Sequence, residues 1–183
     1  MPKIVNRTEY KEELLEKSFE LFARKGYEIT IRELATDLSV STGTLYHYFQ
    51  NKETFFRETM EFVSRKHVDT ILKTMLPDWT NEERVQALFQ YILMNEEYFQ
   101  NLLFLILDYF RQNNSSDPEN IIQNLISSYK NAIRNQLQSD SDEVPNLIIS
   151  FVLGFILQRL LDQDSKMDLG QVTVFKSMLK TIS

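Results

Sequence analysis

Apolar residues recur along almost the whole chain every three or four positions, the spacing that places them on one face of an α-helix. No stretch shows the strict apolar and polar alternation that is typical of a half-buried strand. Start and stop signals divide the pattern into helical segments at residues 8–25, 31–38, 42–48, 51–75, 81–95, 98–112, 118–138, 145–161 and 168–182. The pattern therefore predicts an all-α protein.

Residues at the helix ends support these divisions. Thr30 with Glu33, and again Thr80 with Glu83, have the spacing of a capping box, in which each side chain satisfies a backbone N–H at the helix start. Ser41 is placed to cap the third segment. Other boundaries are predicted at residues that end or begin helices, namely Gly26, Asn51, Pro77, Pro118 and Pro145.

The composition agrees with a helical protein of ordinary size. Of 183 residues only 4 are Gly and 4 are Pro, too few for the many tight turns of a sandwich or barrel. Because the chain has no Cys, disulfide scaffolds, Cys-ligated zinc and thiol redox chemistry are excluded. His47 and His67 do not have the spacing of a helical metal-binding pair, so we expect no metal and no cofactor.

The charge and hydropathy patterns argue against a membrane partner. A formal net charge of -6 gives no overall attraction to anionic membranes or to nucleic acid. The N-terminus lacks the apolar core of a signal peptide, and the longest apolar stretch, residues 147–157, is shorter than the roughly 20 residues of a bilayer span. We expect a cytoplasmic protein.

The informative stretch is residues 30–52, TIRELATDLSVSTGTLYHYFQNK. Two short helices joined by a tight turn, with the small Ala35 where they approach, describe a helix-turn-helix. Its small core is expected to consist of Leu34, Leu38, Val40, Leu45 and Phe49. The second helix then presents to solvent the residue types that bind phosphates and base edges: Thr42, Gly43, Thr44, Tyr46, His47 and Tyr48.

The segment LATDLSVSTGTLYHYFQNK resembles the DNA-binding signature of the TetR family of bacterial transcriptional regulators. The resemblance covers residues 14–57, including the Phe-x-x-x-Gly-Tyr entry at residues 22–27, and the rest of the chain is similar only in length and helical character. It implies a three-helix, helix-turn-helix DNA-binding domain at residues 1–52. Residues 53–183 would then form a larger helical domain for effector binding and dimerisation.

The resemblance also implies roles for individual residues. Thr30 and Lys52 would hold phosphates at two helix N-termini, and Tyr46 would hold a phosphate from the recognition helix. The positions that contact bases or nearby backbone correspond to Thr42, Gly43, Thr44, His47 and Tyr48, and the capping Ser41 is counted with them. The alternatives are packing for Tyr46, and simple exposure to solvent for His47 and Lys52.

Two positions depart from the family pattern. Ser39 stands at a turn position that is usually Gly, where a left-handed serine would cost about 1 kcal/mol. Thr42 stands where relatives often have a basic or longer polar residue, which predicts a weaker contact.

Residues 1–60 carry nine Lys/Arg against ten Asp/Glu. A DNA-binding surface must therefore segregate its cations and use hydroxyls, backbone amides and helix dipoles.

Aromatic, Met and charged residues between positions 91 and 111 are candidates for an effector pocket, because ligand cavities form in the cores of helical bundles. The candidates are Tyr91, Met94, Tyr98, Phe104, Asp108 and Arg111. An ordinary apolar core is the alternative for the aromatic residues. For Asp108, Arg111 and Arg159, ion pairs between helices are the favoured alternative.

Residues 147–161 are apolar nearly all round the predicted helix, which requires burial on several sides. A two-fold dimer interface shared with the last helix explains this pattern, and Gly154 would permit close approach. A central helix of a monomer is the alternative. The interface candidates are Phe151, Gly154, Phe155, Gln158, Phe175 and Leu179.

Together these features predict a ligand-responsive transcriptional regulator. We expect a homodimeric repressor that binds a near-palindromic double-stranded DNA operator and is released by a small-molecule effector. A helical protein-interaction adaptor is the alternative. An enzyme is less favoured, because the sequence contains no nucleophile–base arrangement and no phosphate-binding glycine loop.

Overall fold

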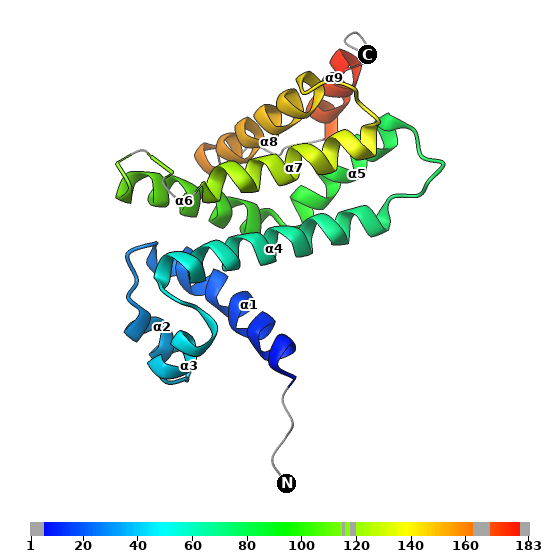
Figure 1. Cartoon of the computed structure of the whole chain (residues 1–183). Helices are drawn as coiled ribbons and strands as arrows, with labels where there is room; N and C mark the ends of the chain where they lie inside the picture. Colours follow the sequence, from blue (N-terminus) through cyan, green and yellow to red (C-terminus); the bar gives the residue numbers. More distant parts are fainter. Residues whose placement is uncertain (1–5, 115, 118–119, 163–168, 180–183) are drawn as a thin grey trace. The chain divides into compact units, whose positions relative to one another are not determined.

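The structure, a computed structural model, describes residues 6–114, 116–117, 120–162 and 169–179. These residues form α-helices and no strand, which confirms the predicted all-α class (Figure 1). The helices are α1 (Arg7–Lys25), α2 (Ile31–Asp37), α3 (Thr42–Tyr48), α4 (Lys52–Thr74), α5 (Asn81–Met94), α6 (Glu96–Gln112), α7 (Ile121–Leu137), α8 (Glu143–Leu161) and α9 (Leu169–Leu179).

The chain divides into two compact units that do not follow the order of the sequence. The first comprises Met1–His67 and Phe104–Leu125, and the second comprises Val68–Leu103 and Ile126–Ser183. Helices α4, α6 and α7 each contribute residues to both units. The family resemblance instead divides the chain by function, into a DNA-binding part up to residue 52 and an effector-binding and dimerisation part after it. The compact units do not test that division, so it stays a prediction.

The first unit is built around aromatic side chains from α1, α4 and α6. Phe22 packs edge to face on Phe56 with ring centroids 5.1 Å apart, and Phe56 stacks on Tyr109 at 5.3 Å. Such ring pairs stabilise a core beyond the area that they bury. Phe49, which directly follows α3, stacks on Phe55 of α4 at 4.1 Å. This contact fixes the end of α3 to the same core.

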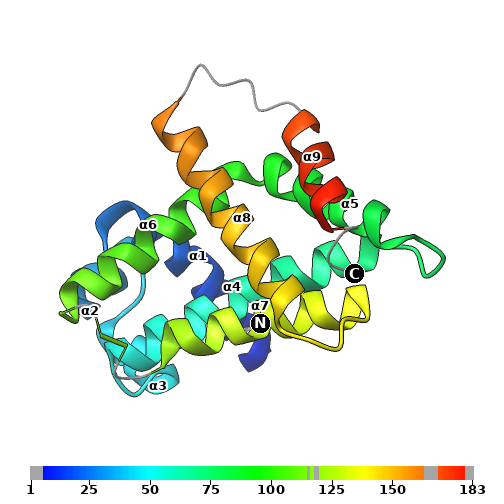
Figure 2. The same ribbon diagram turned by 90° about the horizontal axis from the view of Figure 1, so that it is seen from above.

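The second unit has its own apolar core, to which α5, α8 and α9 contribute. Phe89 of α5 lies 5.4 Å from Phe155 of α8 and 5.8 Å from Phe175 of α9, measured between ring centroids. Figure 2 shows α9 beside α5. The buried members of this core are Val85, Phe89, Ile92, Ile148, Phe155, Ile156, Val172 and Phe175.

Helix α7 begins later than the sequence predicts. Pro118, the expected first residue, lies outside the described residues, and the described helix starts at Ile121. The carboxylate of Asp117 accepts hydrogen bonds from the backbone N–H groups of Ile121, Ile122 and Gln123 at 2.8–2.9 Å. A carboxylate at this end satisfies N–H groups that lack an intrahelical partner and suits the positive end of the helix. Residues 168 and 180–182 of the predicted last helix also lie outside the described residues.

Helix α8 is longer than the apolar stretch recognised in the sequence. Among the described residues it is the one helix long and apolar enough to cross a membrane, by length and composition only. A single helix of this kind is weak evidence, because the core helix of a soluble protein passes the same test. Ile148, Phe155 and Ile156 of α8 pack in the core of the second unit, which accounts for one side of its apolar surface.

Candidate nucleic-acid interface

Helices α2 and α3 form a helix-turn-helix whose turn is closed by backbone hydrogen bonds. The N–H of Ser39 donates to the carbonyl oxygen of Thr36 at 3.0 Å, and the N–H of Val40 donates to that of Ala35 at 2.9 Å. This pair of bonds is the Schellman arrangement, which places a left-handed residue just after the helix. Ser39 adopts that conformation, with φ of 57°. The turn therefore keeps its glycine-type geometry with a serine in it.

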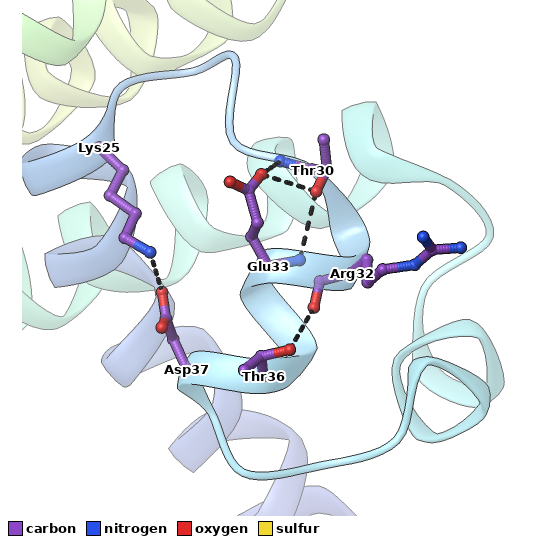
Figure 3. Close-up of polar contacts among 6 residues, drawn as sticks. All are labelled: Lys25, Thr30, Arg32, Glu33, Thr36 and Asp37. Carbon is purple, nitrogen blue, oxygen red and sulfur yellow. Dashed lines mark hydrogen bonds and ion pairs between the residues drawn. The ribbon is translucent and has the colours of Figure 1, made fainter.

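The start of α2 is fixed by the predicted capping box (Figure 3). The Glu33 carboxylate accepts from the hydroxyl and the backbone N–H of Thr30 at 2.7 and 2.9 Å, and the Glu33 N–H donates to the Thr30 hydroxyl at 3.2 Å. The hydroxyl and backbone hydrogen bonds from Thr30 lower the pKa of the Glu33 carboxyl. Because the single hydroxyl proton of Thr30 points to Glu33, a phosphate contact by this hydroxyl requires that bond to be exchanged. The second predicted box, Thr80 with Glu83, is also present at α5.

Further polar contacts hold α2 in place and leave one cation extended. Lys25 of α1 pairs with Asp37 at 2.6 Å, and the Thr36 hydroxyl donates to the carbonyl oxygen of Arg32 at 2.9 Å. The guanidinium of Arg32 points away from these contacts, and the residue is exposed (Figure 3). Arg32 was not among the predicted site residues. Its signal in the sequence is a cation in the first turn of the helix that precedes the recognition helix.

Helix α3 begins at its predicted cap. Ser41 Oγ accepts from the backbone N–H of Thr44 at 2.9 Å and lies 2.9 Å from the Thr44 hydroxyl. Leu45 is completely buried and anchors the helix to the core. The exposed residues on this helix are Thr42, Gly43, Tyr46 and His47, and Tyr46 is 58% exposed. Ser41 and Thr44 therefore shape the start of the recognition helix, whereas these four residues form its outer surface.

Tyr48 does not face solvent as predicted, but is half-buried against α1. Its ring centroid lies 5.8 Å from that of Tyr10, and the guanidinium of Arg7 lies over its face at 5.7 Å. The ring of His47 meets it edge to face at 5.1 Å. Tyr48 therefore supports the recognition surface from behind. The sequence could not reveal this, because Tyr10 and Tyr48 lie far apart in the chain.

Lys52 begins α4 beside the loop that joins α1 to α2. Its Nζ donates to the carbonyl oxygen of Tyr27 at 2.9 Å and lies 4.3 Å from the centroid of the Tyr27 ring. Asn51 caps the helix, since its side-chain oxygen accepts from the N–H of Thr54 at 2.7 Å. The ammonium group is thus held at the helix N-terminus rather than fully solvated, and it keeps further N–H donors for another acceptor.

Ion pairs neutralise many of the lysines in the first unit. The pairs are Lys11 with Glu58, Lys17 with Glu13, Lys25 with Asp37, and Lys66 with Glu16. Other cations among the described residues include Arg7, whose guanidinium lies over the Tyr48 ring of α3, Arg32 on α2, and Lys52 at the start of α4. The positive charge of the candidate interface therefore rests on a few side chains, as the balanced charge of residues 1–60 leads one to expect.

The six predicted pocket residues do not fall in one unit. Phe104, Asp108 and Arg111 line an open hollow of about 350 Å³ in the first unit, together with Phe22, Ala23, Gly26, Leu105 and Leu107. Tyr91, Met94 and Tyr98 belong to the second unit, where Met94 is 84% exposed.

Burial raises the pKa of the Tyr91 phenol. In the described part of the chain, no three acidic or histidine side chains gather where they could hold a metal ion.

The charged residues of α6 and α8 mostly form ion pairs. Arg159 of α8 donates to Glu96 of α6 through Nε and Nη2, both at 2.6 Å, which confirms the expected pairing between helices. Asp108 and Arg111 pair within α6 at 2.7 Å instead. The other carboxylate oxygen of Asp108 accepts from the backbone N–H of Tyr27 at 2.7 Å.

The predicted interface residues on α8 and α9 separate into two groups. Phe155 and Phe175 are 3% and 2% exposed, so they form the core of their own unit and offer no surface to a second copy. Phe151 is half-buried and stacks on Phe175 at 4.1 Å. Gly154 and Gln158 are exposed, and the side chain of Leu179 lies outside the description. The sequence could not separate these groups, because α8 is apolar on both its inner and its outer side.

Comparison with known proteins matches the N-terminal part of the chain. Residues 14–59 match the model of bacterial regulatory proteins, tetR family. The HTH-type transcriptional regulator BetI of Escherichia coli is 30% identical over 91 residues, 48% of this chain and 47% of that protein. The biofilm operon icaADBC HTH-type negative transcriptional regulator IcaR of Staphylococcus epidermidis is 24% identical over 92 residues, 49% of this chain and 50% of that protein. The chain spans about half the length of these curated relatives.

The fold is similar over nearly the whole chain. A candidate transcriptional regulator from Saccharomonospora viridis, solved in complex with choline, has a TM-score of 0.65 at 18% identity, over 93% of this chain and 95% of that one. The capped helices α2 and α3 and the exposed outer surface of α3 define a helix-turn-helix protein. The family that its N-terminal segment resembles is the TetR family of bacterial regulatory proteins, whose model matches residues 14–59.

Proposed function

We propose that this chain is a homodimeric transcriptional repressor that a small-molecule effector releases from its DNA operator. The observation that carries the proposal is the recognition helix α3, whose exposed Thr42, Gly43, Tyr46 and His47 lie inside the segment that matches the family. Short polar and aromatic side chains on one exposed helix suit entry into the major groove. The relatives matched over this region are transcriptional regulators, so we propose a cytoplasmic regulator without enzymatic activity.

The interface residues are proposed to divide into positioning and reading groups. Lys52 and Tyr46 contact phosphates, which fixes the register of the protein on DNA without reading sequence. Arg32 adds a further phosphate contact from α2. Thr42 and His47 reach base edges or the nearby backbone, and Gly43 lets the helix approach closely. The exposure of Arg32 and of the α3 residues supports these roles, and Lys52 stands at the N-terminus of α4.

Three of the predicted DNA-binding residues are proposed to act indirectly. Ser41 and Thr44 are hydrogen-bonded to each other at the start of α3, so they fix the helix that carries the contacts. Tyr48 packs on Tyr10 and orients the recognition helix from behind. Thr30 contacts a phosphate only after its hydroxyl leaves Glu33.

A two-fold dimer is proposed through the outward sides of α8 and α9. Exposed large apolar side chains support this assignment: Leu153, Leu157 and Leu161 on α8, and Val174 and Met178 on α9. In the described part of the chain, apart from the chain neighbours of Gly154 and the nearby backbone of its own helix, no atom lies within 4 Å of where a Cβ on Gly154 would stand, so a second helix can approach there. Apolar residues left exposed on two helices are typical of a subunit interface. A dimer would place one recognition helix in each of two successive major grooves.

The proposed effector is a small apolar or amphipathic molecule. The hollow beside Phe104, Asp108 and Arg111 combines apolar walls with a few charged groups, the composition expected of a ligand site. The Saccharomonospora viridis protein of the same fold was solved with choline, which supports a small-molecule site in such a chain. Release of DNA requires that effector and operator favour different conformations, so each must weaken the binding of the other.

The direct test is a mobility-shift assay with duplexes from the region upstream of the gene that encodes the chain. Wild type should bind one duplex with a sharp preference over scrambled DNA, and His47→Ala should reduce that preference. Lys17→Ala is the matched control, because it removes an α1 cation that is paired with Glu13. A folded wild type without any preference among these duplexes would contradict the proposal.

A further inference from the structure

One residue, Tyr27, links α6 to the start of α4 through both of its backbone polar groups. Its N–H donates to Asp108 Oδ2 at 2.7 Å, and its carbonyl oxygen accepts from Lys52 Nζ at 2.9 Å. Its ring lies 4.3 Å from Lys52 Nζ and packs on Phe56 and Tyr109 at 4.8 and 5.0 Å. Tyr27 is therefore held by Asp108 on one side and holds Lys52 on the other.

The contact from Asp108 depends on a glycine next to Tyr27. Gly26 has φ of 82° and ψ of 171°, a conformation that is essentially restricted to glycine. A Cβ at this position would stand 2.9 Å from Asp108 Oδ2, so any side chain would displace the carboxylate. The Asp108 side chain is 19% exposed, and its second oxygen accepts from Arg111 at 2.7 Å. The carboxylate is thus seated against the loop and oriented by two partners.

The Lys52 ammonium gains a defined direction from this arrangement. Of its three N–H donors one goes to the Tyr27 carbonyl oxygen, and its charge faces the aromatic ring. A free lysine side chain has many rotamers, and it loses this freedom when it binds a partner. Orienting the ammonium beforehand reduces that loss, which is how preorganisation raises affinity.

We propose that Asp108 is a positioning residue for DNA binding, which orients the Lys52 ammonium by holding the Tyr27 backbone. The proposal rests on the proposed DNA-binding function, because it assigns Asp108 a part in the phosphate contact of Lys52. Asp108 itself touches no DNA. If Asp108 served only to stabilise the first unit, its loss would lower the melting temperature but would change neither the reactivity of Lys52 nor its contact with DNA.

The first arm of the test needs no DNA. The acylation rate of Lys52 by an N-hydroxysuccinimide ester, followed by peptide mass spectrometry at low conversion, reports how firmly its ammonium is held. Asp108→Ala should raise this rate several-fold, and Asp108→Asn, which keeps an acceptor oxygen, should raise it less. Glu97→Ala is the matched control: it removes an exposed carboxylate of α6 that has no part in this arrangement, and Lys52 acylation should not change. Lys17 serves as the internal reference in every sample.

The second arm measures operator affinity across a salt series. Lys52→Ala should make the slope of log affinity against log salt shallower by nearly two units in a dimer, at about 0.9 per phosphate contact. Asp108→Ala should produce part of this change in the wild-type background and no further change in the Lys52→Ala background. If Asp108→Ala does not fold, Asp108→Asn takes its place in both experiments.

The two arms separate this inference from the proposed function. Unchanged Lys52 acylation in the folded Asp108 variants would overturn the role of Asp108. An equal loss of affinity from Asp108→Ala with and without Lys52 would overturn it as well. If wild type binds no operator, the proposed function fails, and the acylation arm still decides whether Asp108 orients Lys52.

Discussion

The backbone N–H of Val40 donates to the carbonyl oxygen of Ala35 at 2.9 Å. This bond forms only because the residue directly before Val40 is left-handed, which turns the chain back toward the end of α2. That residue is Ser39, whose φ of 57° is unfavourable for any side chain that carries a Cβ. The helix-turn-helix therefore stores strain at a position where glycine would relieve it.

Replacing Ser39 with glycine should stabilise the protein. Removal of the Cβ relieves about 1 kcal/mol of left-handed strain, partly offset by the greater freedom of glycine in the unfolded chain. The measurement is chemical unfolding of Ser39→Gly and wild type under identical conditions. Ser39→Ala, which keeps the Cβ, is the control and should bring no gain. A less stable Ser39→Gly protein would contradict the account of the turn.

The capping box predicts a pH-dependent contribution from Glu33. Hydrogen bonds from Thr30 lower the pKa of the Glu33 carboxyl in the folded state. The stabilisation from Glu33 is therefore complete above the pKa that this carboxyl has in the unfolded chain. It is lost as the pH falls through the lower, folded-state pKa. Glu33→Gln should therefore be less stable than wild type at neutral pH, and the difference should shrink in acid. Thermal unfolding from pH 7 to pH 3 measures this, with Glu12→Gln on the exposed face of α1 as control.

Arg84 should be sensitive even to lysine. Its guanidinium donates to the carbonyl oxygens of Trp79, Pro77 and Gln136, and so ties the loop before α5 to the end of α7. An ammonium group cannot reproduce this planar fork, and each lost hydrogen bond costs about 0.5–1.5 kcal/mol. Arg84→Lys should therefore lower the free energy of unfolding, as measured in urea. The exposed Arg24→Lys is the control, and equal stabilities of the two variants would contradict the clamp.

Substitutions on the buried and the exposed side of α8 should have different effects, the first on stability and the second on dimerisation. Phe155→Ala removes a core side chain, so it should cost about 3–5 kcal/mol of stability. Leu157→Arg places a charge on the outward side, where it should leave each protomer folded and dissociate the dimer. Sedimentation equilibrium with circular dichroism separates the two effects. A wild type that is already monomeric at micromolar concentration would contradict the proposed interface.

Positioning and reading residues should respond differently to salt and to sequence. Lys52→Ala should weaken binding to operator and scrambled DNA alike. His47→Ala should cost about 1–3 kcal/mol on the operator and relax preference at one symmetric pair of positions, with little change in salt slope. Tyr48→Ala should mainly lower the melting temperature, because Tyr48 packs on Tyr10. Titrations of the three variants across a salt series test the assignment. It is wrong if Lys52→Ala alters sequence preference while His47→Ala changes only the slope.

Features that depend on near neighbours in the chain could be predicted from the amino-acid sequence. The apolar spacing specified helices and no strands, and the capping pairs at Thr30 and Thr80 stand where the sequence predicts them. These features are readable because a helix and its cap are formed by residues three or four positions apart. The exposed surface of α3 is likewise evident, apart from Thr44 and Tyr48, which are only partly exposed.

Features that depend on residues far apart in the sequence became visible only in the folded chain. In the folded chain Tyr48 packs against α1, and Phe155 of α8 and Phe175 of α9 lie in the core of the second unit. The uniformly apolar pattern of α8 did not show which of its sides is buried in that core. Asp108 and Tyr27 are 81 residues apart, and Tyr27 and Lys52 are 25 apart, so no local pattern connects them. Such contacts follow from how helices pack on one another. A one-dimensional pattern shows which residues seek burial or a partner, but only the packed chain selects the partner.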